Sequence, residues 1–302
     1  MGRLRSSFPI AVGLSLLGAC GDGSQEPALR PTKIYWTAWK TEGSDIATIR
    51  RANLDGSDVE DLISLDTNAA GIAVDGAGGK VYWTTGADSP PKIQRANLDG
   101  SDVEDILTGL PLPLGIAIDA TVAEMYWVDL ASPSGSGGEL QRATLDGDGV
   151  TTLVTGIASP ASIALDPQAG KMYWTANSNF LPTGGWTGSV QRANLDGTDV
   201  EDVVTGVANL WGVAADARDG KIYWTSESLG IQRADRDGRN VENLLTLEAG
   251  ADGIVSDGRG GRLYFTHLSG DPIERIRLDG SVRTVLVPEP GKSQYIALGP
   301  DR

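Results

Sequence analysis

The chain has 302 residues, of which 40% are apolar and 40 are glycine, and its formal net charge at pH 7 is −15. The apolar content suffices for a packed core, while the acidity argues against nucleic acid and anionic membrane surfaces as electrostatic partners. One cysteine excludes a disulfide framework, and one histidine excludes a pH switch built from clustered histidines.

The first segment in chain order has the features of an export signal. Arginines precede an apolar run from Phe8 to Leu17, which is too short to span a membrane. The following "LLGAC" resembles a bacterial lipobox, which is cleaved before the cysteine, here Cys20, and carries lipid on its thiol. An ordinary signal peptide with an incidental cysteine is the alternative. We predict a signal peptide over residues 1–19 and, over residues 20–30, the lipidated cysteine and a flexible tether.

From residue 31 onward, three short motifs recur at intervals of about 45 residues. The first contains Tyr-Trp or Tyr-Phe, and it begins at Ile34, Val81, Met125, Met172, Ile222 and Leu263. The second, typified by "GIAVD", precedes five of these and begins at Gly71, Gly115, Ser162, Gly212 and Gly253. The third, typified by "RANLDG", follows each of them and begins at Arg51, Arg95, Arg142, Arg192, Arg233 and Arg275. Linked motifs at one period predict a repeat architecture.

Each repeat is predicted to contain four short strands. "GIAVD" and "KVYWTT" are apolar runs joined by a Gly-rich hairpin turn, and "KIQRANL" and "VEDILTG" supply the third and fourth strands. Between the last two lies "DGSD". Asp-Gly between apolar runs is a strong hairpin signal, because glycine accepts a positive φ and Asp bonds its own backbone. A metal-binding loop is the alternative, but the oxygen ligands at every second position of a calcium loop are missing.

Four strands in each of six repeats predict an all-β fold, a six-bladed β-propeller with antiparallel blades over residues 31–302. The first repeat starts directly with its "IYWTA" strand and has no "GIAVD" strand before it. The segment "QYIALGPD" from Gln294 resembles that missing inner strand. We therefore expect the C-terminal strand to join the first blade and close the ring, which removes exposed sheet edges.

These motifs resemble the YWTD repeats of low-density lipoprotein receptor class B propellers, and the resemblance extends over about residues 31–302. It implies that the motif strand packs blade against blade and that one face of the propeller binds other proteins. The family's acid at the fourth motif position is kept only at Asp129, so its inter-blade bonds are not expected in the other blades. The other five repeats carry Ala38, Thr85, Ala176, Ser226 and His267 at that position. The disulfide-rich EGF-like modules that flank receptor propellers are not expected in a chain with one cysteine.

The sequence offers few residues for catalysis. Some six-bladed propellers are hydrolases, and the gluconolactonase-like ones hold a divalent metal at the axis with Glu, Asn and Asp. The residues expected to ring the axis here are Ala70, Leu114, Ala161, Trp211, Asp252 and Gln294. Only Asp252 is acidic, and one carboxylate does not form a cage for a hard cation. We predict no cofactor, although a divalent cation at the axis is not excluded, and we expect His267 to be a structural surface residue.

Beyond the signal peptide and the motif strands, five aromatic residues remain: Trp39, Phe180, Trp186, Trp211 and Tyr295. The predicted topology places them on one face, formed by the loops between second and third strands and by the connections into the inner strands. Plugging of the channel mouth is the alternative for Tyr295 and Trp211. Because exposed aromatic residues on one face mark binding sites, we predict that these five and Asp252 form a ligand-binding face.

Together these features predict a non-catalytic, monomeric binding propeller in a bacterial cell envelope, held to a membrane by its N-terminal lipid alone. The expected partner is a protein or peptide, with a glycan as a further option. Two alternatives remain. One is a metal-dependent lactonase or other hydrolase of the gluconolactonase-like type, and the other is a structural envelope component without a discrete ligand.

Overall fold

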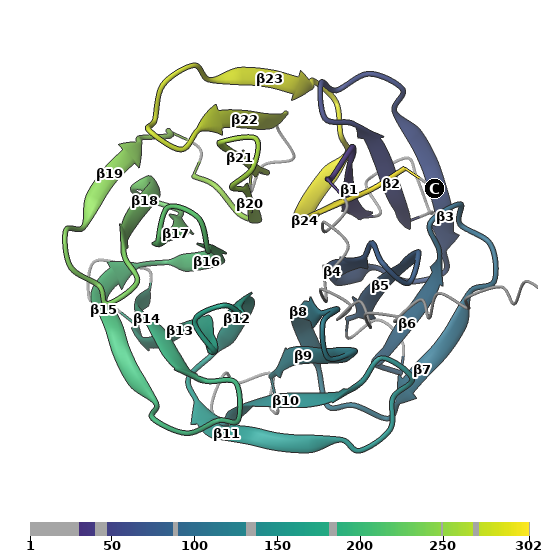
Figure 1. The fold of residues 1–302 in the computed structure, drawn as a ribbon, viewed down its shortest axis with the longest axis horizontal. Helices are drawn as coiled ribbons and strands as arrows, with labels where there is room; N and C mark the ends of the chain where they lie inside the picture. Colours follow the sequence, from purple (N-terminus) through teal and green to yellow (C-terminus); the bar gives the residue numbers. More distant parts are fainter. Residues whose placement is uncertain are drawn as a thin grey trace, which may run out of the picture.

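The computed structural model describes residues 30–39, 47–86, 90–130, 137–180, 186–248, 250–267 and 272–301. These residues form twenty-four strands in six four-stranded antiparallel sheets, which surround a central axis as the blades of a propeller (Figure 1). The predicted six-bladed fold is confirmed. The predicted signal peptide, Cys20 and residues 21–29 of the predicted tether lie outside the described residues.

Each of the first three blades takes its strands from the axis outward in the same way. Blade 1 contains β24 (Lys292–Gly299), β1 (Lys33–Trp39), β2 (Ala47–Asn53) and β3 (Glu60–Leu65). Blade 2 contains β4 (Ala69–Asp75), β5 (Lys80–Thr85), β6 (Lys92–Asn97) and β7 (Glu104–Thr108). Blade 3 contains β8 (Pro113–Asp119), β9 (Glu124–Asp129), β10 (Gly138–Thr144) and β11 (Thr151–Ile157).

The remaining blades follow the same order. Blade 4 contains β12 (Pro160–Asp166), β13 (Lys171–Phe180), β14 (Trp186–Asn194) and β15 (Glu201–Ala208). Blade 5 contains β16 (Leu210–Asp216), β17 (Lys221–Ser226), β18 (Gly230–Asp235) and β19 (Glu242–Leu245). Blade 6 contains β20 (Ile254–Asp257), β21 (Arg262–Phe265), β22 (Ile273–Arg277) and β23 (Thr284–Val287).

The ring closes where the two ends of the propeller meet. β24 pairs antiparallel with β1, from Lys33 opposite Gly299 onward, and Figure 1 shows the yellow C-terminal strand beside the purple first strand. The Tyr35 hydroxyl donates a hydrogen bond of 2.9 Å to the Pro300 carbonyl. The C-terminal strand therefore completes the first blade, as the sequence predicted.

The aromatic pair of the repeated motif explains how the blades pack. Tyr82 and Trp83 are adjacent in β5 and both are buried, but their side chains point to opposite faces of the sheet. Trp83 belongs to the apolar cluster that contains Tyr35 of blade 1, whereas Tyr82 belongs to the cluster that contains Trp127 of blade 3. One dipeptide therefore packs its blade against both neighbours.

Hydrogen bonds between blades come from the threonine of the motif. The Thr84 hydroxyl donates to the Leu114 carbonyl of the next blade and accepts from the Gly71 amide of its own blade, at 2.7 and 2.8 Å. A Cβ at position 71 would lie 2.3 Å from the Leu114 oxygen, so this approach requires glycine. The equivalent bonds to the next blade join Thr175 to Trp211, Thr225 to Asp252 and Thr266 to Gln294. Asp129 instead accepts from the Leu112 amide in the segment leading into its own blade, at 2.6 Å.

Candidate functional site

The propeller has two faces with different loops. We define the turn face by the hairpins between first and second strands and between third and fourth strands, such as residues 75–80 and 97–104. We define the loop face by the opposite ends of the strands, where the second and third strands are connected and the chain enters each new blade. Of the binding residues predicted from the sequence, Trp39, Phe180, Trp186 and Trp211 lie at or next to the loop-face ends of their strands. Asp252 lies just before β20, and Tyr295 lies within β24.

On the turn face, the repeated "NLDGSD" forms the same turn in blade after blade. The Asp55 carboxylate accepts from the Ser57 amide and hydroxyl, at 3.0 and 2.6 Å, and these bonds lower the pKa of Asp55. The Asn53 amide donates to the Asp58 carboxylate at 2.7 Å. Equivalent bonds join Asn97 to Asp102 and Asn194 to Asp199, and in blade 5 the two residue types are exchanged as Asp235 and Asn240. The turn prediction is confirmed, and these acids are engaged within their own turns.

The same turns also link the blades. The arginine that opens "RANLDG" in β2, Arg51, donates to the Leu98 carbonyl in the turn of blade 2, at 2.7 Å. Arg275 donates to the Leu54 carbonyl in blade 1 at 2.9 Å and so bridges the closure of the ring. Gly100 has a φ of +84°, and a Cβ there would lie 2.5 Å from the Leu62 oxygen of blade 1. The repeated motif is thus explained by turn geometry and by contacts between blades.

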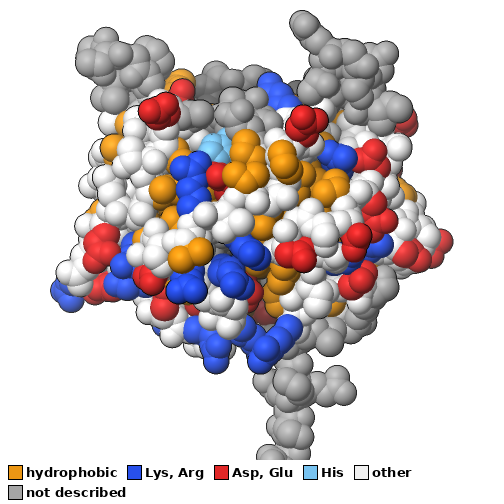
Figure 2. All heavy atoms as spheres, turned by 90° about the horizontal axis from the view of Figure 1, so that it is seen from above, with side chains coloured by type: hydrophobic (Ala, Val, Ile, Leu, Met, Phe, Trp, Pro, Cys, Tyr) orange, Lys and Arg blue, Asp and Glu red, His pale blue; other side chains and the backbone are white. Residues whose placement is uncertain are grey.

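The centre of the turn face holds a depression of about 640 Å³. Its lining includes the exposed side chains of Arg218 and Arg259 together with Asp216 and Asp257. Pro31, near the start of the described chain, also lines it. Figure 2 shows the disc from its edge, with Lys and Arg side chains gathered along the lower border.

The loop face contains a pocket of about 420 Å³ that takes residues from blades 3, 4 and 5. Two tryptophans line it: Trp186 at the start of β14, whose side chain is 43% exposed, and the half-buried Trp211 in β16. The other lining residues are Leu114, Leu130, Ser159, Pro160, Ala161, Asn177, Asn209, Leu210 and Glu227. The fold therefore brings together two tryptophans that are 25 positions apart in the sequence.

Asparagine side chains fix the backbone around this pocket. The Trp186 amide donates to the Asn209 side-chain oxygen at 2.6 Å, and the Asn209 amide donates to the Trp186 carbonyl at 2.8 Å. The Asn177 side chain bonds both the amide and the carbonyl of Leu210, at 3.1 and 2.9 Å. The tryptophans thus project from backbone segments that are held in place before any ligand arrives.

The pocket contains one exposed acidic group and one buried donor. The Trp211 indole nitrogen is buried and has no hydrogen-bond partner among the described residues. Glu227 is exposed, and its Oε2 accepts from the Asn209 side-chain amide at 2.9 Å. The walls of the pocket are otherwise mainly apolar, and an apolar concavity with a few placed polar groups is the usual form of a binding site.

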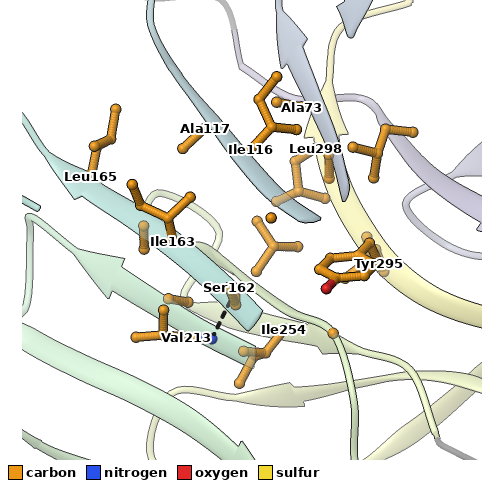
Figure 3. A pocket seen from close by; sticks show the side chains of 18 of the residues that line it. Ala73, Ile116, Ala117, Ser162, Ile163, Leu165, Val213, Ile254, Tyr295 and Leu298 are labelled. Carbon is orange, nitrogen blue, oxygen red and sulfur yellow. Dashed lines mark hydrogen bonds between the residues drawn. The ribbon is translucent and has the colours of Figure 1, made fainter. Parts of the chain in front are cut away.

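The axis of the propeller is closed on the loop face by Tyr295. Its hydroxyl donates to the Ala161 carbonyl of the opposite blade at 2.9 Å. Below it lies a channel of about 300 Å³, lined by apolar residues of the inner strands, where the Ser162 hydroxyl accepts from the Val213 amide (Figure 3). This position supports the interpretation of Tyr295 as a plug of the channel mouth.

Asp252 is buried near this plug. The residue is only 3% exposed, and its Oδ2 has no hydrogen-bond partner among the described residues. Burial raises the pKa of Asp252 well above that of an exposed carboxyl group, and burial and the charge of Asp252 raise the pKa of Tyr295. Among the described residues, no three His, Cys, Asp or Glu side chains gather as a metal-binding group.

The two remaining predicted aromatic residues are not among the described residues that line the pocket. Trp39 at the end of β1 is half-buried between blades, where its indole donates to the Ala69 carbonyl at 2.5 Å and Lys292 lies 5.7 Å from the ring. The backbone of Phe180 lies opposite Trp186 in the β13–β14 pair, but its side chain is outside the described part of the structure.

The expected surface position of His267 is wrong. His267 is only 4% exposed, and its Nε2 lies 2.9 Å from the buried Glu274 carboxylate, which also accepts from Arg283. In blade 2, the motif tryptophan Trp83 donates to Gln94. In blade 6, Phe265 replaces the tryptophan and Glu274 replaces the glutamine, so the histidine takes over the bond.

Comparison with known proteins relates one of these repeats to a described family. The family described as low-density lipoprotein receptor repeat class B matches residues 32–75, which contain the first motif strand and the first "RANLDG" turn. The same motifs form all six blades. The chain is thus a six-bladed propeller in which residues 32–75 match a class B repeat. No curated protein matches its sequence significantly.

Solved structures support the propeller fold. A chain in the crystal structure of a nidogen/laminin complex has a TM-score of 0.74 and 22% identity, covering 88% of this chain and 98% of that one. TolB from Acinetobacter baumannii has a TM-score of 0.70 and 15% identity, covering 89% of this chain and 67% of that one. At these identities the likeness concerns the fold. Among the described residues, no helix has the length and apolarity of a membrane span.

Proposed function

We propose that this propeller is a non-catalytic binding protein that recognises a protein or peptide through its loop face. The observation that carries this proposal is the pocket of Trp186 and Trp211, in which an exposed tryptophan stands on a backbone fixed by Asn209. Tryptophans that are exposed in the free protein and held rigidly are typical anchors of protein interfaces, because they bury a large area at a small entropic cost.

The comparisons and the opposite face support the same proposal. A chain of similar fold occurs in a crystal structure of a nidogen/laminin complex, so this architecture is found in an assembly of two proteins. On the turn face, the repeated acids bond within their own turns, as Asp55 and Asp58 do. Carboxylates that already accept hydrogen bonds within their own turn contribute little to recognition of a partner.

A hydrolase would need a metal site at the axis. Asp252 is the acidic residue among those that the sequence analysis expects around the axis. Tyr295 lies over the channel there. We infer that Asp252 is a structural residue, and metal analysis of the purified protein tests this. A stoichiometric divalent ion that is lost in the Asp252→Ala variant would instead favour the hydrolase.

We further propose that the protein is a lipoprotein of a bacterial envelope, tethered through Cys20. Pro31 lines the depression at the centre of the turn face, so a tether formed by residues 20–30 would leave from that face. Eleven extended residues reach at most about 36 Å. The turn face would then lie toward the membrane, and the loop face with its tryptophans would point away from it.

Replacement of the lipidated residue tests the tether. The Cys20→Ser variant should move from the membrane fraction to the soluble fraction, with its propeller still folded. Full retention of this variant in membranes would contradict the lipid anchor without affecting the proposal for the loop face.

A capture experiment tests the binding function. The soluble form, residues 21–302, should retain a protein or peptide from an envelope extract, and Trp186→Ala should weaken that retention by about 2 kcal/mol or more, roughly 30-fold in Kd. Asp99→Ala on the turn face is the control and should retain the partner when folded. Retention by Trp186→Ala with loss in folded Asp99→Ala would place the site on the other face, and a retained glycan would redefine the ligand class.

A further inference from the structure

The loop-face pocket contains one acidic group among aromatic and aliphatic walls. Glu227 is the charged residue in its described lining, and its side chain is exposed. The carboxylate is held at a fixed place because Asn209 donates to Oε2 at 2.9 Å. Oε1 is left to meet a ligand, in a protein whose formal net charge is −15.

The tryptophans add a second attraction for cations. The face of an indole ring attracts an ammonium or guanidinium group, and the interaction is strongest where water is partly excluded. Trp186 and Trp211 line the same concavity as Glu227. Aliphatic walls such as Leu130 and Pro160 suit the methylene stem that precedes the charge in lysine and arginine.

The Trp211 indole N–H is a buried donor without a described partner, so a ligand in the pocket meets the ring of Trp211 rather than its N–H. A basic side chain offers the two features that this surface suits, a cationic tip and a methylene stem.

We propose that this pocket binds an arginine or lysine side chain of the protein partner, with the cation between the indole faces and Glu227. The inference rests on the proposed binding function and adds the chemical class of the anchor residue. It also fits the overall charge, because a basic segment would be attracted to an acidic protein from a distance.

Small amides test the pocket without a known partner. In a ¹H–¹⁵N spectrum, the indole signals of Trp186 and Trp211 should shift saturably when Nα-acetyl-arginine amide or Nα-acetyl-lysine amide is added. The isosteric but uncharged Nα-acetyl-citrulline amide should bind at least 5-fold more weakly than the arginine amide. Equal binding of citrulline and arginine, or no shift with either cation, would overturn the proposal.

Two glutamate variants give a matched comparison. Glu227→Gln keeps an oxygen for Asn209 but removes the charge, and it should weaken binding of the arginine amide at least 5-fold. Glu289→Gln removes an exposed glutamate between β23 and β24, outside the pocket lining, and should bind as the wild type does. An unchanged affinity in Glu227→Gln contradicts the proposal.

The partner separates this inference from the function on which it rests. If Trp186→Ala loses the captured partner while Glu227→Gln keeps it with unchanged affinity, the loop-face function stands and the basic anchor is wrong. If Trp186→Ala keeps the partner with wild-type affinity, the proposed function itself is wrong.

Discussion

The two faces of the propeller are built from the same six repeats but use their side chains in different ways. On the turn face, the Asn53 side chain bonds Asp58 and the Asp55 carboxylate accepts from Ser57, and blade 2 repeats both bonds. On the loop face, the residues that occupy the fourth motif position differ in type and in partner. Asp129 accepts from a backbone amide and His267 binds Glu274.

The difference separates maintenance of the fold from recognition. Repetition on the turn face satisfies the same requirements at each blade, namely a left-handed glycine and a link to the next blade. Departure from repetition on the loop face places two tryptophans in a pocket between blades 3, 4 and 5. A partner without sixfold symmetry is matched better by such an asymmetric feature than by a repeated one.

The largest loss of stability is expected when the ring of blades is opened, because both faces depend on the closed ring. Deletion of residues 293–302 removes nearly all of β24 and leaves β1 without its inner neighbour. We expect a loss of stability above about 5 kcal/mol, more than single substitutions cause. Thermal unfolding measures it, and an unchanged Tm in the truncated protein would contradict the closure of the ring.

A glycine substitution sharpens the role of the turn face. Gly100→Ala places a methyl group against the Leu62 carbonyl at a φ of +84°, and it should cost about 3 kcal/mol from strain and overpacking. Gly220→Ala is the matched control, because its φ is +71° but no atom lies within 4 Å of the added carbon. It should cost only about 1 kcal/mol. Equal losses in denaturant unfolding would mean that the contact between blades contributes nothing.

A smaller effect is expected at the axis, and it depends on pH. Burial raises the folded-state pKa of Asp252, so its contribution to stability is full below the unfolded pKa of about 3.9 and is lost as pH rises toward the folded value. Asp252→Asn should therefore raise Tm by a few degrees at pH 8 and by less at pH 4. A Tm difference that is the same at both pH values would contradict the raised pKa.

The blades could be predicted because their requirements recur. A buried Tyr-Trp pair, an inner glycine and an Asp-Gly turn appear in successive repeats, and each has one structural solution. The missing strand before Ile34 and the extra strand after Gln294 also predicted the closure. Repetition supplied several independent observations of the same unit.

The pocket was only partly predictable. Trp186 and Trp211 could be assigned to one face, but their shared pocket depends on Asn209, whose role follows from a left-handed φ of +48° and from contacts with β14. A signal was present in "NLWG", which departs from the small residues that precede the inner glycine in "NAAG". Glu227 carried no such signal, because exposed glutamates are common and its distance to Asn209 appears only in the fold.

We propose that recognition takes place on the loop face. Amide hydrogen exchange of the soluble form, with and without the captured partner, tests it across both faces in one measurement. We predict slower exchange on binding at residues 186–188 and 209–212, and unchanged exchange in the turns at residues 53–58 and 97–102. Protection confined to those turns, with the pocket unaffected, would contradict this account.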